Sequence, residues 1–410
     1  MSTRDRNTLA TLFFSVFATV IGVGIVVPLL PVYAHGLGAN GLTIGLLFAV
    51  FALSRTLFLP GFGRLSDRKG RKALIVPGLF AYAAISVALA WVDDVAGLIA
   101  VRFLHGIASA MLMPVIQAYV GDLAPRGREG RLLGIHGAFV LAGMSIGPMV
   151  GGLIHDHFGL RFAFLSMGAL SFAGAVLCAC LLPGARDERI TRRREPAAWK
   201  ELIRGGNLAA LFGFRFTYVV CIGIIWGFLP LYGALELSLS GASIGLLITL
   251  GILASAVMNA PMGFLADRVD RRFMVIGGGL LAAYAMLSFV WAQEYRDAAL
   301  ASILFGVGGG ISMPAVMAMA ARNGSGRESM GSVMALMTVA HSLGMLAGAL
   351  AGGIVMTRFQ LHAVFPAGAA AMAMGIGWFV VVTLLRGART AGERTAADRV
   401  LSVDPVAARR

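Results

Sequence analysis

Charged residues are scarce in this sequence. Only 13% of its 410 residues are Asp, Glu, Lys or Arg, whereas 58% are hydrophobic. Soluble globular proteins carry about 25% charged residues, which is what keeps their surfaces hydrated. The composition therefore excludes an ordinary soluble domain and indicates a chain that lies in lipid.

Cysteine is rare as well, and the three cysteines, Cys178, Cys180 and Cys221, all fall inside apolar segments. Neither their spacing nor their setting suggests a disulfide framework or a metal site. The sequence also lacks a phosphate-binding glycine-rich loop, a carboxylate pair and a nucleophile with a neighbouring base. We therefore expect no metal, no other cofactor, no ATP-driven step and no enzymatic activity.

Long apolar runs are what the sequence does have. A helix of about 20 apolar residues crosses about 30 Å of hydrocarbon and satisfies its own backbone hydrogen bonds there. Twelve such runs begin near Leu9, Leu42, Ala73, Ala96, Leu132, Phe162, Leu208, Ile244, Phe273, Leu300, Met330 and Ala363. The start "MSTRDRNTLA" leads into the first run without a clear cleavage site, so we expect that run to be retained. The fold class predicted is an all-α integral membrane protein with twelve transmembrane helices.

The net charge of +14 is explained by membrane topology. If the chain starts in the cytoplasm, only Arg161, Arg296 and Arg358 lie on the far side, as the positive-inside pattern requires. The cytoplasmic set is Arg64, Arg68, Lys69, Arg71, Lys72, Arg126, Arg128, Arg131, Arg268, Arg271, Arg272, Arg322 and Arg327, with both tails. We expect a multi-pass protein of the bacterial cytoplasmic (inner) membrane with both termini cytoplasmic. Nucleic acid binding is the less economical explanation of the charge.

The two halves of the chain repeat each other. "SIGLLITL" from Ser243 matches "TIGLLFAV" from Thr43, and Asp67 and Asp267 keep the same offset of 200 residues. Glycines 143, 147, 151 and 152 correspond to glycines 344, 348, 352 and 353 at an offset of 201. The pattern predicts two pseudo-symmetric six-helix bundles, residues 1–183 and 207–386, that arose by duplication.

Two polar segments flank the second bundle. We expect residues 184–206 to form a cytoplasmic linker, either a flexible tether or a short helix on the membrane surface. Residues 387–410 are polar and rich in arginine, and we expect a disordered cytoplasmic tail.

Three motifs carry a resemblance to a known family. They are "GRLSDRKGRK" from Gly63, "RFLHGIASA" from Arg102 and "GMSIGPMVGG" from Gly143. Together they resemble the major facilitator superfamily, and the third resembles its twelve-helix drug:proton antiporter branch. His105 stands where that family commonly has a glutamine. The resemblance implies a secondary transporter that works by alternating access, and we expect a monomer.

The first motif places charges around a helix end at the cytoplasmic side. Asp67 can oppose the positive end of a neighbouring helix, and Arg68 and Arg71 can bridge to acids such as Asp122. We predict a cytoplasmic gate that holds this side shut and separates when the halves rock. Its residues are Gly63, Asp67, Arg68, Gly70, Arg71, Lys72 and Asp122, with Gly263, Asp267, Arg268 and Arg271 from the repeat. The alternative is that the basic residues only anchor the topology.

The third motif forms a stripe of small residues along one helix. Small side chains let membrane helices approach closely, and a proline permits a bend. We predict that Gly143, Gly147, Pro148, Gly151 and Gly152 let this helix bend and slide against its counterpart across the interface between the halves. Close packing without motion is the alternative.

Polar and ionisable groups inside apolar runs are candidates for the proton and substrate pathway. They are Arg55, Arg102, His105, Gln117 and Arg215, although arginines near span ends can also snorkel to the surface. Gln117 has the alternative of bonding a neighbouring helix. No Asp or Glu lies in the middle of a span, so we expect proton coupling to run through Arg102 and His105.

Three functions remain open at this point. The first is proton-coupled efflux of small amphipathic compounds, as in a multidrug exporter, with protons and the bilayer as the other partners. The second is an uptake or exchange carrier for an organic anion, which embedded arginines without embedded acids would favour. The third, of another class, is a membrane receptor or enzyme on the same scaffold.

Overall fold

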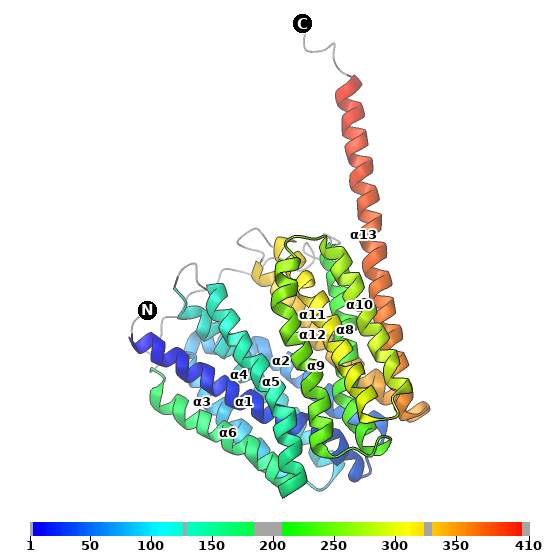
Figure 1. Cartoon of the computed structure of the whole chain (residues 1–410). Helices are drawn as coiled ribbons and strands as arrows, with labels where there is room; N and C mark the ends of the chain where they lie inside the picture. The colour runs from blue at the N-terminus through cyan, green and yellow to red at the C-terminus, as the bar shows by residue number, and fades with distance from the viewer. Residues whose placement is uncertain (1–2, 126–128, 184–206, 324–329, 404–410) are drawn as a thin grey trace.

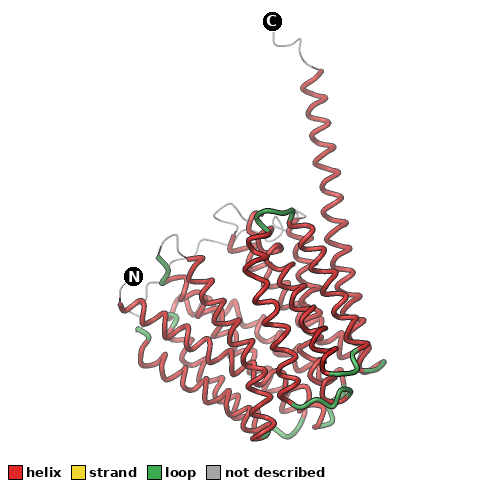
Figure 2. The backbone as a smooth tube through the Cα atoms, in the orientation of Figure 1, coloured by secondary structure: helices red, strands yellow, loops and turns green. Residues whose placement is uncertain are grey.

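The computed structural model of the protein describes residues 3–125, 129–183, 207–323 and 330–403, and these residues contain helices and no strand (Figure 2). Twelve of the helices are long and apolar enough to cross a membrane. The first six are α1 (Thr3–Gly36), α2 (Gly41–Lys69), α3 (Lys72–Trp91), α4 (Val95–Asp122), α5 (Glu129–Phe158) and α6 (Leu160–Leu181). The second six are α8 (Asn207–Leu235), α9 (Gly241–Leu265), α10 (Arg271–Ser288), α11 (Tyr295–Asn323), α12 (Met330–Arg358) and α13 (Val364–Val403), with short 3-10 turns at Phe289–Trp291 and Leu361–Ala363.

The twelve apolar runs expected from the sequence are confirmed as these helices. Polar side chains begin them where the chain turns: Asn40 accepts from the Thr43 N–H at 2.9 Å, and Asp94 accepts from the Gly97 N–H at 2.6 Å. Such caps satisfy backbone donors that have no partner within the helix. Gly70 ends α2 with a φ of 92°, which a residue with a side chain rarely adopts.

The C-terminal tail differs from the expectation. The helix α13 continues to Val403, so the segment from residue 387 that we expected to be disordered is helical as far as that residue. Its alanines, arginines and glutamate are good helix formers, which outweighs its polarity. Figure 1 shows this part of α13 projecting beyond the bundle. The expected linker, residues 184–206, lies outside the described residues.

The helices form two bundles that lie side by side (Figure 1). In the first, α1 packs against α5 and α6, α3 packs against α4 and α6, and α2 packs against α4. In the second, α8 packs against α12 and α13, α10 packs against α11 and α13, and α9 packs against α11. Two helix pairs, α2 with α12 and α5 with α9, make most of the contact between the bundles. These pairs are equivalent under the repeat, because α2 corresponds to α9 and α5 to α12.

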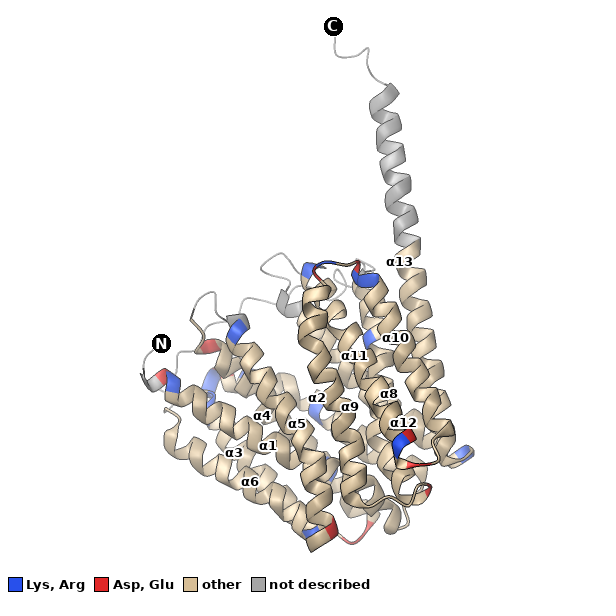
Figure 3. Ribbon diagram, viewed as in Figure 1, with Lys and Arg blue, Asp and Glu red and all other residues tan. Residues whose placement is uncertain are grey.

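Charged residues gather at the helix ends, and the shafts of the helices carry few (Figure 3). We call the side with the α2–α3 and α9–α10 connections the termini face, because the N-terminus of α1 lies there, and the other side the opposite face. Arg161, Arg296 and Arg358 lie at helix ends on the opposite face. Three of the predicted cytoplasmic residues, Arg126, Arg128 and Arg327, lie outside the described residues.

The bundles touch each other near the opposite face. A Cβ atom added at Gly45 would overlap the carbonyl oxygen of Ala349, and one added at Gly245 would overlap that of Pro148. Near the termini face, glycines 61, 63, 134, 137 and 263 have no atom of a neighbouring element within 4 Å of such a Cβ. The helices of the two bundles are inclined to one another accordingly (Figure 1). The space between the bundles is therefore closed at the opposite face and open toward the termini face.

Candidate functional site

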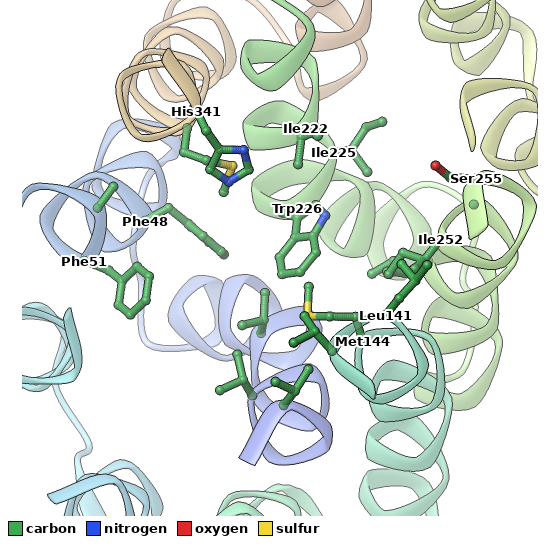
Figure 4. Close-up of a pocket in the computed structure, with 18 of the residues that line it drawn as sticks. Phe48, Phe51, Leu141, Met144, Ile222, Ile225, Trp226, Ile252, Ser255 and His341 are labelled. Atoms are coloured by element: carbon green, nitrogen blue, oxygen red, sulfur yellow. The ribbon is translucent and has the colours of Figure 1, made fainter. Parts of the chain in front are cut away.

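A cavity of about 470 Å³ lies between the two bundles. Its wall comes from α1, α2, α4 and α5 of the first bundle, α8, α9, α11 and α12 of the second, and Tyr82 of α3. Figure 4 shows Trp226 near its centre, between Phe48 of α2 and Met144 of α5. Aromatic and thioether side chains adapt to apolar ligands of varied shape. The cavity has the size and the lining of a site for a drug-sized molecule.

Three methionines, Met113, Met144 and Met345, line the cavity. Other methionines of α11 and α12 pack within or against the hydrophobic core; they are Met313, Met317, Met319, Met334 and Met337. A membrane helix is apolar on every side, so its sequence does not distinguish a side that faces a cavity from one that faces a neighbour.

Arg102 and His105 lie together on α4, as their spacing of three residues requires. Arg102 is only 2% exposed, and its Nη1 donates to Nδ1 of His105 at 3.1 Å while its Nε donates to the Leu47 carbonyl at 3.3 Å. Its guanidinium carbon lies 4.4 Å from the centre of the Phe51 ring. Because a guanidinium only donates, Nδ1 of His105 is an acceptor here. Arg102 is thus fixed inside the bundle and does not snorkel.

His105 contacts Arg102 and is not itself part of the cavity wall. Its ring packs edge-on against Phe51 and Tyr82, with ring centres 5.3 and 4.7 Å apart. Its Nε2 is buried and has no hydrogen-bond partner among the described residues. A proton that arrives at Nδ1 would remove the acceptor that Arg102 uses. Protonation of His105 and the position of Arg102 are therefore mutually dependent.

Arg55 of α2 also lines the cavity, and it has a different setting. Its Nε is enclosed without a hydrogen-bond partner, and none of the described residues forms a hydrogen bond or ion pair with its guanidinium. No Asp or Glu is present in the cavity wall among the described residues. The wall therefore carries two arginines that no carboxylate neutralises.

The remaining pathway candidates lie elsewhere. Arg215 of α8 donates from Nε to the Met337 carbonyl at 2.9 Å and contacts the Met313 sulfur, outside the cavity wall. Gln117 is exposed on α4 and does not line the cavity. Another ionisable residue, His341 of α12, lines the cavity near Phe48 (Figure 4).

The predicted gate residues form a cluster within the first bundle. Arg71 is buried and binds Asp122 of α4 at 3.0 Å and Asp67 of α2 at 2.5 Å, and it also donates to the Ser66 hydroxyl. Lys72 donates to the carbonyls of Ala179 and Leu182 at the end of α6. Arg68 is exposed, and Gly63 meets no neighbour. In this conformation the Arg71–Asp122 and Arg71–Asp67 ion pairs both join residues of the same bundle.

The repeat of this cluster in the second bundle is more open. Arg271 binds Asp267 at 3.1 Å, but the Asp267 side chain is 75% exposed. Asp270 stands where the first copy has Gly70, and it caps α10 by accepting from the Arg272 N–H at 2.9 Å. Arg268 is exposed, and Gly263 meets no neighbour.

The glycine motif of α5 faces two partners. Added Cβ atoms at Gly143, Gly147 and Gly151 would press on α1 of the same bundle, because a spacing of four keeps these glycines on one side. Gly152 and Pro148, about 100° further around the helix, meet α9 of the other bundle. Only part of the motif therefore lies at the interface where we expected sliding.

Two contacts at the opposite face join the bundles and were not anticipated. The Asp156 carboxylate, at the end of α5, accepts from the N–H groups of Gly241 and Ala242 at 2.9 and 2.8 Å, at the start of α9. The Thr357 hydroxyl, at the end of α12, accepts from the Leu42 N–H at 2.9 Å, at the start of α2. Thr357 follows Asp156 by 201 residues, which is the offset of the glycine motif. We call these two contacts the cross-bundle caps.

Known proteins resemble this chain along most of its length. The family model described as Major Facilitator Superfamily matches residues 12–236 and 211–407. An MFS-type transporter of Methanocaldococcus jannaschii is 29% identical over 87% of this chain and 92% of its own length. The multi-drug resistance efflux pump PmrA of Streptococcus pneumoniae is 29% identical over 88% of this chain and 92% of its own. The crystal structure of a bacterial homologue of the human lysosomal transporter Spinster, in an inward-facing and unoccupied conformation, aligns with a TM-score of 0.77 at 14% identity, over 93% and 96% of the two chains.

Proposed function

Because the chain belongs to the Major Facilitator Superfamily and is a small-molecule transporter rather than an enzyme, we propose that it exports small amphipathic compounds in exchange for protons. The observation that carries this proposal is the apolar cavity between the bundles, closed at one face and open toward the other. The name of the relative PmrA, a multi-drug efflux pump, supports the same direction of transport.

The proposed direction of transport depends on the membrane orientation that the distribution of arginine and lysine favours. Loops rich in arginine and lysine stay in the cytoplasm, so the termini face is the cytoplasmic face under this proposal. The cavity then opens to the cytoplasm, from which an exporter loads its substrate. An inner-membrane location with cytoplasmic termini belongs to the same proposal.

Alternating access requires the contacts at the opposite face to open as the cytoplasmic side closes. The cross-bundle caps and the glycine contacts hold the opposite face shut in this conformation. The exposed Arg68 and Asp67, together with Arg268 and Asp267, are available to meet the other bundle when the cytoplasmic side shuts. In this gate the buried ion pairs around Arg71 stay in place, and the exposed charges of the cluster change partners.

Proton coupling is assigned to Arg102 and His105. Arg102 lines the cavity, and its bond to His105 requires an unprotonated Nδ1. A proton on Nδ1 would displace the guanidinium and change the cavity that the substrate meets. Tyr82 and Arg102 are the titratable groups that face the His105 ring, and no carboxylate among the described residues competes for the proton.

Everted membrane vesicles provide the test. With the cytoplasmic face outward and an acidic lumen, vesicles holding the protein should accumulate the neutral lipophilic dye N-phenyl-1-naphthylamine, and a protonophore should release it. Trp226→Ala should reduce accumulation several-fold, whereas Trp291→Ala, which changes a 67% exposed tryptophan, should not. Accumulation that needs the opposite pH gradient would favour the alternative of an uptake carrier. Dye levels equal to those of vesicles without the protein would overturn the proposal.

A further inference from the structure

Building on the proposed function, we propose that the cavity selects amphipathic molecules that carry a negative charge, and that Arg55 binds their anionic group. Arg55 faces the cavity with its guanidinium unpaired among the described residues. A cation enclosed in an apolar site is costly unless an anion or several hydrogen bonds compensate it. The missing partner is therefore a part of the ligand.

The position of Arg55 places the anion next to Arg102. The backbone of Arg55 lies against Gly106, one residue beyond His105 on α4. Arg102 also lines the cavity, and its hydrogen bonds to described residues go to neutral acceptors, the Leu47 carbonyl and His105. Both positive charges thus favour an anion, and they disfavour a cationic compound in the same place.

Among the residues that the structure describes, the second bundle adds no carboxylate to the cavity wall. The residues 200 positions after Arg55 and Arg102 are Ser255 and Ser302, and both line the cavity. The Ser302 hydroxyl is buried and has no hydrogen-bond partner among the residues that the structure describes. A carboxylate or sulfonate between the bundles would find guanidinium donors on one side and a hydroxyl donor on the other.

The rest of the ligand must be apolar. Trp226, Phe48, Met144 and Ile252 belong to the wall of the same cavity (Figure 4). A small hydrophilic anion would leave these side chains in contact with water and would gain nothing from them. The ligand class is therefore an aromatic or alkyl carboxylate or sulfonate.

Two probes with the same apolar body test the charge. 1-Anilinonaphthalene-8-sulfonate carries a sulfonate on the anilinonaphthalene frame, and N-phenyl-1-naphthylamine is that frame without charge. Binding to the full chain in nanodiscs is measured by energy transfer from tryptophan. The energy-transfer signal of the Trp226→Phe variant, which lacks the tryptophan of the cavity, is subtracted as the background from probe dissolved in the lipid. The wild type should bind the sulfonate at least tenfold more tightly than the neutral probe.

Variants of Arg55 localise the effect. Arg55→Gln should weaken sulfonate binding about tenfold to a hundredfold, since a hydrogen bond to a charged group is lost. It should change binding of the neutral probe less than twofold, which also shows that the variant is folded. Arg55→Lys should recover most of the sulfonate affinity, and the control Arg296→Gln, at an exposed arginine on the opposite face, should match the wild type.

The outcomes separate this proposal from the export function. Equal affinity for the two probes, or an equal loss of both in Arg55→Gln, would overturn the anion site even if the vesicles export the neutral dye. Failure of the vesicles to accumulate any dye, combined with sulfonate binding that depends on Arg55, would refute export and leave the anion site standing. Saturable binding of neither probe would also overturn the anion site.

Discussion

Replacing Asp156 with asparagine should loosen the opposite face of the protein. The Asp156 carboxylate accepts two backbone N–H groups at the start of α9, at 2.9 and 2.8 Å, across the boundary between the bundles. The first N–H groups of a helix have no partner within it, and they carry the positive end of its dipole. A carboxylate there stabilises by about 0.5 to 2 kcal/mol in measured helix caps.

The loss can be worked out from this geometry. Asparagine keeps one oxygen, so one of the two hydrogen bonds can remain while the charge and the second bond disappear. The Asp156 side chain is 25% exposed, so solvent screens part of the charge interaction. We expect a loss of about 1 kcal/mol. The bond exists only while the opposite face is closed, so this loss shifts the ratio of closed to open molecules about fivefold.

Distances between spin labels can measure that shift. In a cysteine-free background, labels at Phe158 and Gln293 report on the opposite face, and labels at Lys69 and Val269 report on the termini face. Asp156→Asn should enlarge the population of long distances in the first pair and of short distances in the second. Asp93→Asn, at an exposed aspartate of the same face that makes no contact between the bundles, is the matched control. Unchanged distributions in Asp156→Asn would refute the assignment of a cap that holds the two bundles together.

Two further substitutions test the gate and the coupling route. Asp67→Asn should reduce dye accumulation in vesicles sharply while membrane expression stays unchanged. Asp267→Asn should reduce it less, because the Asp267 side chain is more exposed than that of Asp67. Wild-type accumulation in Asp67→Asn would mean that the cluster only sets the membrane topology. His105→Gln should fold and bind the neutral probe but change the pH dependence of transport, because the Arg102 partner no longer titrates; an unchanged pH profile would exclude His105 as the proton carrier.

The sequence predicted the fold well because few backbone structures satisfy their hydrogen bonds inside a bilayer. A run of about 20 apolar residues in lipid has to be a helix, and twelve such runs begin within about five residues of the helices observed. The repeat offset paired each helix with its counterpart. The tail beyond residue 387 was misjudged, because its polarity excludes a packed core without excluding a helix.

The site was predicted only in part, and the reason is physical. Arg55 and Arg102 stood out because charge is costly inside an apolar run, and both line the cavity. Trp226 gave no such signal, since an aromatic residue suits a lipid-facing, core or cavity position equally well. Asp156 resembled an ordinary polar residue at a helix end, and the N–H groups it binds lie 85 and 86 residues further along the chain.

The two bundles share their packing and differ in their chemistry. Gly45 against Ala349 and Gly245 against Pro148 are equivalent backbone contacts, so the repeat preserves the surface on which the bundles meet. The charged residues differ between the bundles: Arg55 corresponds to Ser255 under the repeat, and Asp156 corresponds to Thr357. Under the proposed alternating access, a larger side chain at Gly45 or Gly245 should obstruct the rocking motion and so reduce transport of every substrate. A change at Arg55 acts on a group that only one bundle supplies, so it should alter which substrates are carried while the rocking motion remains.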